Sequence, residues 1–304
     1  MIALISHEDC ALHQMGLEHP EQPARLDAIH DRLISSNLSM VLFEHDAPLA
    51  TREQLERAHD PEYVAEIFAV SPKEGSVWLD GDTSMNPHSL NAALRAAGAA
   101  VHGVDLVMHG PCQVAFCNVR PPGHHAEHNR AMGFCIFNNI AVGAAHAMAH
   151  YGLERVAIVD FDVHHGNGTE DIFADEPRVL FCSTFQSPFY PFKGADTVSD
   201  HIINCPLPAG TDSQGFRAAV TDRWLPALTN FQPELLMISA GFDAHIADEM
   251  AHFRLMEADY TWVTLELRQI ADQYAKGRIV SSLEGGYDLG ALGRSVYAHL
   301  NALF

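Results

Sequence analysis

Short apolar runs alternate with longer amphipathic or Ala-rich stretches along this chain. The runs are rich in β-branched residues and end in turn-forming residues, which is typical of buried strands. Strands are predicted at 2–6, 40–44, 113–119, 155–163, 179–184, 202–206, 235–240 and 278–283. Helices are predicted at 25–35, 61–70, 89–108, 138–151, 213–230, 256–276 and 289–303. This order predicts an α/β fold in which an open, mainly parallel β-sheet carries helices on both faces.

The alternation continues along the chain without a break in composition. No internal repeat, low-complexity tract or linker interrupts it, and 304 residues are enough for a sizeable core. We therefore predict a single domain over residues 1–304.

Acidic residues outnumber basic residues by 39 to 18, which gives a formal net charge of −21. Direct binding to nucleic acid is disfavoured, because it depends on Lys and Arg side chains that neutralise phosphates. The same charge favours cationic substrates, such as lysine-containing peptides or polyamines, through long-range attraction.

Neither a secretory signal nor a membrane span is predicted. The N-terminal apolar run is short and lacks a basic flank, and no stretch approaches the roughly 18 uninterrupted apolar residues of a span. The six cysteines include no Cys-x-x-Cys pair and fall in apparent core segments. We expect a cytoplasmic protein with reduced thiols that does not contact membranes.

One predicted strand ends in a group of ionisable residues, Asp160, Asp162 and His164. Alternate residues of a strand share a face, so these side chains would point the same way. A lone Asp at such a place is most often a turn former, and the chain has 20 histidines. Two carboxylates and an imidazole on a buried strand are nevertheless costly unless a positive charge lies between them. A metal ion is the simplest candidate.

Three other polar segments, at 117–126, 239–244 and 283–288, also lie at the ends of predicted strands. Ligand sites in open α/β sheets form beyond the carboxyl ends of the strands. We therefore expect these segments and the 160–164 segment to build one shared site.

The ionisable residues of these segments fit a hydrolytic metal site. Asp162, His164 and Asp243 would supply three ligands and leave positions open for water and substrate. This donor set is rich in oxygen for Zn²⁺, and Fe²⁺ or Co²⁺ would also suit it.

Acid–base chemistry needs further groups beside the metal. His124 and His125 are candidates, because imidazole titrates near neutrality. Tyr287 could donate a hydrogen bond to the oxyanion of a tetrahedral intermediate. A buried tyrosine usually packs in the core, but Tyr287 follows Glu-Gly-Gly at a strand end, which favours a role in the site.

Several motifs in a fixed order resemble the histone deacetylase superfamily. They are Arg-Pro-Pro-Gly-His-His-Ala at 120–126, Gly-Phe-Cys at 133–135, Asp-Phe-Asp-Val-His-His-Gly-Asn-Gly-Thr at 160–169, Ser-Ala-Gly-Phe-Asp-Ala at 239–244 and Glu-Gly-Gly-Tyr-Asp-Leu at 284–289. The class II and bacterial deacetylase-like branch is the most similar. The resemblance begins near residue 19 and continues to the last predicted helix, and it implies the arginase/deacetylase-like form of the α/β fold.

The resemblance implies that Zn²⁺ is held by Asp162, His164 and Asp243. It also implies that His125 is the main general base and that His124 is an electrostatic helper or acid.

The remaining catalytic roles follow from the same resemblance. Tyr287 would polarise the scissile carbonyl, Asp160 would orient His124, and Asn167 would orient His125. Some family members have Asp where Asn167 stands. A neutral partner should give His125 a lower pKa than a carboxylate would.

The resemblance also places residues at the substrate and at a second ion. The expected substrate-binding residues are Gly133 and Phe134 on one channel wall, Phe189 or Tyr190 on the facing wall, Gly286 near Tyr287, and Asp82 at the rim. A structural monovalent cation, often K⁺, would lie among Asp160, Asp162, His164, Ser183 and Thr184.

The chain departs from the family pattern beside the expected channel. Phe185 stands where many relatives have His, and Phe192-Lys193 replaces Gly-Thr in the usual Tyr-Pro-Gly-Thr-Gly. Polyamine-specific members carry an acidic gatekeeper at a position that aligns with Met250, although Glu249 is adjacent. These features favour an acylated lysine peptide or protein over a small acylated amine such as an acetylpolyamine.

Other classes of function fit the sequence less well. A binuclear arginase-like hydrolase needs a third Asp that the run after His164 lacks, and a serine hydrolase needs a Gly-x-Ser-x-Gly elbow that is absent. A Cys–His hydrolase using Cys135 would need a positioned base. A metal-dependent module that binds acyl groups without cleaving them would be expected to lack Tyr287 or the histidine pair, and both are present.

Overall fold

Eight parallel strands form one sheet in the computed structural model, which describes residues 1–304. The order across the sheet is β2 (Leu42–Asp46), β1 (Ile2–Ser6), β5 (Val114–Cys117), β10 (Ile279–Leu283), β9 (Leu235–Ala240), β6 (Val156–Asp160), β7 (Val179–Gln186) and β8 (Ile202–Leu207). All pairings in this sheet are parallel. The predicted α/β architecture is therefore confirmed.

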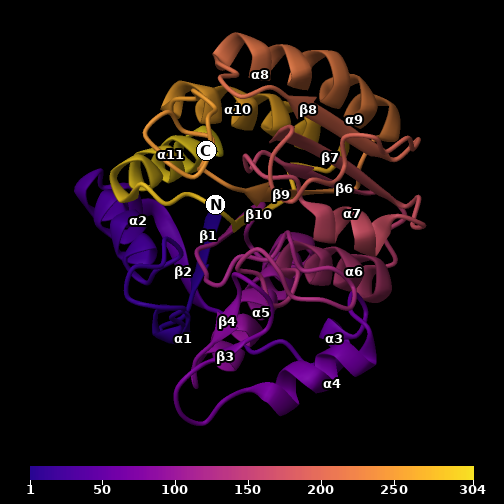
Figure 1. Ribbon diagram of the computed structural model, residues 1–304. Helices are drawn as coiled ribbons and strands as arrows, with labels where there is room; N and C mark the ends of the chain where they lie inside the picture. The colour runs from indigo at the N-terminus through magenta and orange to yellow at the C-terminus, as the bar shows by residue number, and fades with distance from the viewer.

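Helices cover both faces of the sheet (Figure 1). One face carries α5 (Ser89–Met108), α6 (Asn139–Tyr151) and α7 (Asn167–Phe173). The other carries α2 (Ala24–Ser35), α8 (Ser213–Ala219), α9 (Leu225–Phe231), α10 (Glu257–Tyr274) and α11 (Leu289–Ala302). Three further helices belong to the first 70 residues of the chain: α1 (Asp9–Leu12), α3 (Arg52–Leu55) and α4 (Pro61–Val70). None of the helices is long and apolar enough to cross a membrane.

Two hydrophobic cores lie on the two faces of the sheet. In β1, Ala3 and Ile5 pack in the core beneath α5 and α6, whereas Ile2 and Leu4 pack in the core beneath α2, α10 and α11. This alternation explains why the strands are apolar at nearly every position, since both faces are covered.

One predicted helix is interrupted in the structure, and another helix was not predicted. The segment predicted as one helix at 213–230 contains a π-helical turn at Val220–Trp224 between α8 and α9. Pro226 lies at the start of α9, and its ring cannot follow a regular turn without meeting the carbonyl four residues earlier. The helix α7 starts at Asn167, in the segment after β6 for which no helix was predicted.

Several short elements were not predicted, among them the helices α1 and α3. A 3-10 turn occupies Leu38–Val41, so β2 begins at Leu42 and not at residue 40 as predicted. The turn follows Asn37, which has the left-handed conformation. The strands β3 (Val77–Trp78) and β4 (Ser84–Met85) form a two-stranded antiparallel ribbon. Two residues are too few for an alternating pattern to stand out in a sequence.

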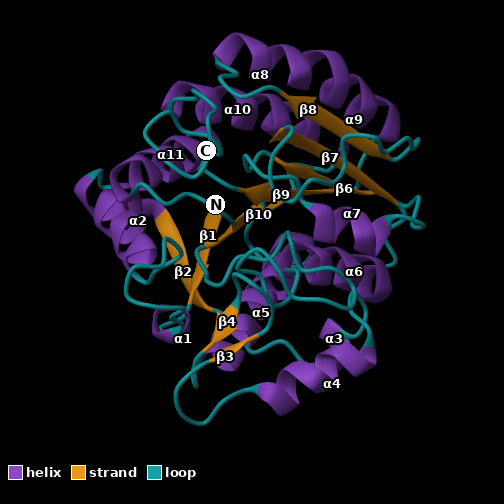
Figure 2. Cartoon of the chain, in the orientation of Figure 1, coloured by secondary structure: helices purple, strands orange, loops and turns teal.

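Loops follow the carboxyl ends of the four central strands β5, β10, β9 and β6, and those after β5 and β9 are long, at 118–138 and 241–256 (Figure 2). These strands are neighbours in the sheet although they are far apart in the chain. The four polar segments singled out from the sequence are therefore brought to one edge of the sheet.

Candidate active site

The segment after β6 turns through hydrogen bonds from its own aspartates. The strand ends at Asp160, so the prediction of a strand to residue 163 is wrong. Asp160 accepts from the backbone N–H of Asp162 at 3.1 Å, and Asp162 accepts from that of His164 at 2.9 Å. An aspartate that bonds the N–H two residues on favours a turn over a ladder. These turns, rather than strand alternation, direct the side chains.

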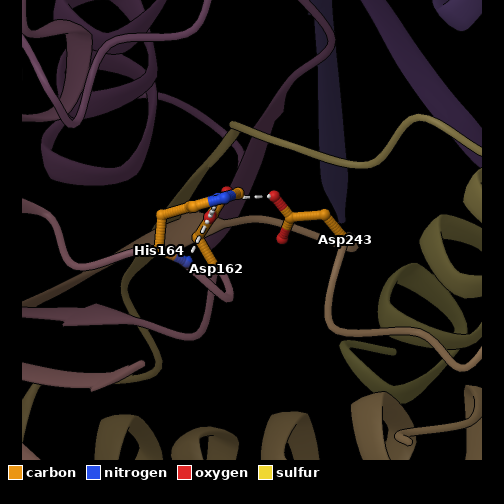
Figure 3. A group of neighbouring side chains, drawn as sticks. All are labelled: Asp162, His164 and Asp243. Carbon is orange, nitrogen blue, oxygen red and sulfur yellow. Dashed lines mark hydrogen bonds and ion pairs between the residues drawn. The ribbon is translucent and has the colours of Figure 1, made fainter. Parts of the chain in front are cut away.

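Three buried side chains, Asp162, His164 and Asp243, converge at this turn, and their ligand atoms lie within 4.8 Å of one another. The imidazole of His164 lies between the two carboxylates, with its Nδ1 atom 3.1 Å from an oxygen of each (Figure 3). Backbone N–H groups hold the carboxylates from behind, because Asp162 accepts from Gly285 at 2.8 Å and Asp243 from Val163 at 3.0 Å.

The buried charges of Asp162, His164 and Asp243 favour the binding of a cation. Burial, followed by the charge of Asp162, raises the pKa of Asp243 to about 7. Burial would lower the pKa of His164, but its hydrogen bonds with both carboxylates raise it to about 10. A Cβ at Gly285 would overlap both carboxylates, so the backbone there approaches as closely as glycine allows. Two carboxylates and one imidazole around a common point suit a divalent metal with open positions.

The two adjacent histidines have different partners. His124 Nδ1 lies 2.8 Å from Asp160, and His125 Nδ1 lies 2.7 Å from Oδ1 of Asn167. Burial opposes the charge on His124, but the carboxylates of Asp160 and Asp162 raise its pKa well above the usual value. Burial, and then the nearby His124 and His164, hold the pKa of His125 well below the usual value. The pair therefore combines a cationic ring with a neutral one.

The largest cause of the low pKa of His125 is burial, and the hydrogen bond with Asn167 raises this pKa. That an amide partner gives His125 a lower pKa than a carboxylate would stays a prediction.

A cavity of about 260 Å³ leads to His125 and His164. Its lining residues are Asp82, His125, Gly133, Phe134, His164, Phe189, Tyr190, Met250 and Tyr287. Phe189 stacks on His164 with ring centroids 5.6 Å apart, and Phe134 meets Tyr287 edge-on at 6.0 Å. The aromatic lining suits a partly apolar substrate group.

Asp82 helps to shape this cavity. One of its oxygens accepts from Gly133 N at 3.0 Å, and Thr83 Oγ1 accepts from Phe134 N at 3.0 Å. Gly133 and Phe134 both have positive φ, 58° and 69°, which is unfavourable for phenylalanine. The turn at Asp82 and Thr83 therefore holds a strained segment of the cavity wall.

Comparison with known proteins identifies the family. The histone deacetylase domain model matches residues 19–303. This chain belongs to the histone deacetylase family. It is 34% identical to histone deacetylase 14, chloroplastic, of Arabidopsis thaliana over 99% of this chain and 76% of that protein. It is 36% identical to the polyamine deacetylase HDAC10 of Homo sapiens over 97% of this chain and 46% of that protein.

A solved structure shows the same fold. The HDA15 HD domain superposes with a TM-score of 0.94 at 33% identity, covering 99% of this chain and 89% of that one. Family membership and fold together make this chain a hydrolytic deacetylase.

Tyr287 of this deacetylase is held by residues to which the sequence analysis gave no role. Asp248 accepts from the backbone N–H of Tyr287 at 2.6 Å, and the guanidinium of Arg25 lies 4.9 Å from the ring centroid. Burial raises the pKa of Tyr287 well above the usual value, and Arg25 opposes this. The phenol is thus a hydrogen-bond donor at neutral pH.

Gly286 is not among the residues that line the cavity. Its carbonyl accepts from Arg25 Nε at 2.7 Å, so it anchors the loop that carries Tyr287. Arg25 in turn pairs with Glu21 at 3.0 Å, and both side chains are fully buried. Glu21 precedes α2 and Arg25 lies in its first turn, so only their spacing of four residues was available as a sequence signal.

Glu284 is a further site residue with no assigned role. Its carboxylate accepts from the backbone N–H of Gly123 at 2.6 Å and of His124 at 3.1 Å. Burial raises its pKa to about 7. It fixes the segment that carries the histidine pair.

Cys135 does not fit a nucleophile. It is fully buried, its thiol lies 3.2 Å from the carbonyl of Gly133, and burial raises its pKa well above the usual value. A reactive cysteine needs the opposite shift.

The residues expected around a monovalent cation also lie together. Ser183 and Thr184 are on β7, and Ser183 is the register partner of Asp160 on β6. The hydroxyl of Ser183 is buried and has no hydrogen-bond partner. An unpartnered buried oxygen is compatible with an ion ligand.

Proposed function

We propose that this protein is a zinc-dependent deacylase that hydrolyses the amide of N-acetyl-lysine in proteins or peptides. The observation that carries the proposal is that His164, which groups with Asp162 and Asp243, lines an aromatic cavity together with His125 and Tyr287. A Zn²⁺ ion held by the three ligands would lower the pKa of a water molecule and polarise a carbonyl group.

The protein groups supply the remaining chemistry. The acylated side chain lies between Phe134 and Phe189, with its amide near Tyr287. His125, neutral at pH 7, accepts the proton of the attacking water through Nε2. Tyr287 donates a hydrogen bond to the carbonyl oxygen as negative charge develops there. His124, held protonated by Asp160, stabilises that charge.

The C–N bond then breaks. His125 returns its proton to the leaving amine, so the acid and the base are the same residue at different steps. The products are a carboxylate and a free amine, which balances the added water. Asn167 orients the His125 ring through the 2.7 Å contact with Nδ1.

A structural monovalent cation, K⁺, is part of the proposal. Asp160, Asp162, His164, Ser183 and Thr184 would surround it with side-chain and backbone oxygens. The unpartnered Ser183 hydroxyl supports this position. A reducing compartment such as the cytoplasm is also proposed, because all six cysteines are buried and unpaired.

Acetylpolyamine hydrolysis is the second candidate. A cavity of about 290 Å³ adjoins the channel at Met250 and Tyr287 and is lined by Asp248, Glu249 and Asp288. Such carboxylates favour a cationic amine, and a polyamine deacetylase is among the relatives. The channel itself, however, is lined by Met250 rather than by Glu249, which favours acyl-lysine.

The test is acetate release by metal-loaded protein from a panel that varies acyl length and amine carrier together. We expect the highest kcat/KM with an acetyl-lysine peptide, and a Tyr287→Phe variant that binds metal but turns over about 100-fold more slowly. Faster hydrolysis of acetylpolyamines would support the second candidate. Metal binding and acyl-peptide binding without acetate release from any substrate would indicate a non-catalytic binding module.

Parallel loading with Zn²⁺, Fe²⁺ and Co²⁺ tests the choice of metal. The donor set admits all three ions. Zinc is supported if it gives the tightest binding at equal activity.

A further inference from the structure

Asn167 links His125 to a second carboxylate. Its Oδ1 atom lies 2.7 Å from His125 Nδ1, and its Nδ2 atom donates to Oε1 of Glu127 at 2.7 Å. The three residues are 2%, 4% and 6% exposed for Asn167, His125 and Glu127 respectively. The hydrogen-bonded series from His125 through Asn167 to Glu127 is therefore nearly free of solvent.

The direction of the Asn167 amide decides where His125 carries its proton. An amide oxygen can only accept, so in the observed direction Nδ1 of His125 bears the hydrogen and Nε2 is free to accept one. A turned amide would present its NH₂ group to Nδ1 and move the hydrogen to Nε2. The ring would then have no lone pair for the attacking water, and the wrong tautomer is costly to catalysis.

A carboxylate partner does not have this problem, because its two oxygens are equivalent. An asparagine needs something to fix its direction. Glu127 provides it, since a carboxylate accepts and cannot donate. The other neighbours of Nδ2, the His125 carbonyl at 3.4 Å and Met132 Sδ at 3.3 Å, are longer and uncharged contacts.

Glu127 is itself held by two cations. Lys193 Nζ donates to the same Oε1 atom at 2.6 Å, and Arg130 donates to Oε2 at 2.9 Å. His59 Nδ1 lies 2.9 Å from the backbone carbonyl of Glu127. The carboxylate is thus fixed in position from both of its oxygens and from its backbone.

Lys193 belongs to the loop that forms one channel wall. The next residue, Gly194, has φ of 83°, and its carbonyl accepts from Asn204 at 2.8 Å. A Cβ at Gly194 would overlap the ring of His165, so the loop lies directly on that side chain. The Phe192-Lys193 departure therefore has a structural consequence, because it brings an anchored cation to Glu127.

We propose that Glu127 is a positioning residue that fixes the amide of Asn167 and thereby keeps the proton of His125 on Nδ1. Lys193 holds Glu127 in place for this purpose. The inference rests on the proposed function of His125 as the general base. It gives roles to two residues, Glu127 and Lys193, outside the catalytic group itself.

A four-variant exchange tests the inference through activity. Glu127→Ala should lower kcat about tenfold to 100-fold with KM and metal content unchanged. The reason is that a large fraction of the molecules would then have the Asn167 amide turned, with its NH₂ group toward His125. Glu127→Gln should retain kcat within about threefold, since a glutamine oxygen can still accept from Asn167.

The exchange of charge between the two positions is the decisive comparison. Asn167→Asp alone places two carboxylates in contact and should lower kcat at least about tenfold. The double variant Asn167→Asp/Glu127→Gln restores one carboxylate and one amide and should recover most of that loss. A double variant no better than Asn167→Asp overturns the inference. Glu53→Gln, which removes the ion pair between the exposed Glu53 and Arg57, is the matched control and should leave kcat unchanged.

A second measurement does not depend on catalysis. Long-range ¹H–¹⁵N NMR of the metal-free protein at pH 8 reports which nitrogen of His125 is protonated, and the signal is assigned by its loss in His125→Phe. We expect Nδ1–H in the wild type and in Glu127→Gln, and a mixture of tautomers in Glu127→Ala. Pure Nδ1–H in Glu127→Ala overturns the inference. An inactive wild type with these expected spectra would refute the proposed function and leave the inference standing.

Discussion

The Nδ1 atom of His164 lies 3.1 Å from a carboxylate oxygen of Asp243, although 79 residues separate them in the chain. The two residues follow β6 and β9, which are adjacent in the sheet. Their contact makes a half-site on one strand end into a three-ligand group.

Replacing Asp243 should remove the metal. Asp243→Asn keeps the shape of the side chain but loses the charge that balances a divalent cation. We expect metal affinity to fall by at least about 100-fold, in proportion to the loss of a direct ligand. Titration against a chelating indicator measures this. Asp272→Asn, at an exposed residue of α10, is the control; an equal loss there would mean that the metal binds elsewhere.

Chelation and thiol alkylation should have opposite effects. Metal removal should abolish hydrolysis, and Zn²⁺ should restore it. Iodoacetamide should spare activity in the native protein, because all six cysteines are buried and burial raises the pKa of Cys135 well above the usual value. Activity lost to alkylation of Cys135, located by mass spectrometry, would contradict the metal mechanism.

The buried Glu21 should make the free energy of unfolding depend on pH in the acidic range. Burial opposes its ionisation, but Arg120 and Arg25 lower its pKa from 4.5 to about 2. Its contribution is therefore complete above pH 4.5 and is lost as the pH falls toward 2. The shift corresponds to about 3 kcal/mol of unfolding free energy, consistent with the usual cost of breaking a buried pair.

Urea unfolding of Glu21→Gln measures this contribution. The variant should be less stable than the wild type at pH 7, and the difference should shrink between pH 4.5 and 3. Glu53→Gln, whose side chain is 81% exposed, should match the wild type throughout. A pH-independent difference would assign the loss to packing alone.

Lys193→Met should impair turnover less than Glu127→Ala does. The ion pair to Oε1 is lost, but Arg130 still holds Oε2. We expect kcat to fall about threefold, below the tenfold or greater effect of losing an orienting partner entirely. Lys73→Met, at an exposed lysine, controls for the change in net charge. A loss equal to that of Glu127→Ala would mean that Arg130 contributes nothing.

Long buried strands and helices were predictable because their pattern repeats many times. The bounds of α4, α5, β1 and β9 agree with the predicted ranges. The β6 strand was predicted too long, because an Asp at every second position fits both a strand and a series of aspartate turns. The structure has turns after Asp160. The helix at 213–230 was predicted without its π turn, although Pro226 marks the place.

The sequence by itself determined the parallel sheet, the grouping of polar segments at strand ends and the motifs of the family, because these depend on local periodicity and on neighbouring residues. Only the tertiary structure decided what surrounds the reacting groups. Arg25 beside Tyr287, Glu284 beneath His124 and Glu127 behind Asn167 are each supplied by a distant part of the chain. Burial sets the pKa of His125 more than Asn167 does, and burial is a property of the packed molecule.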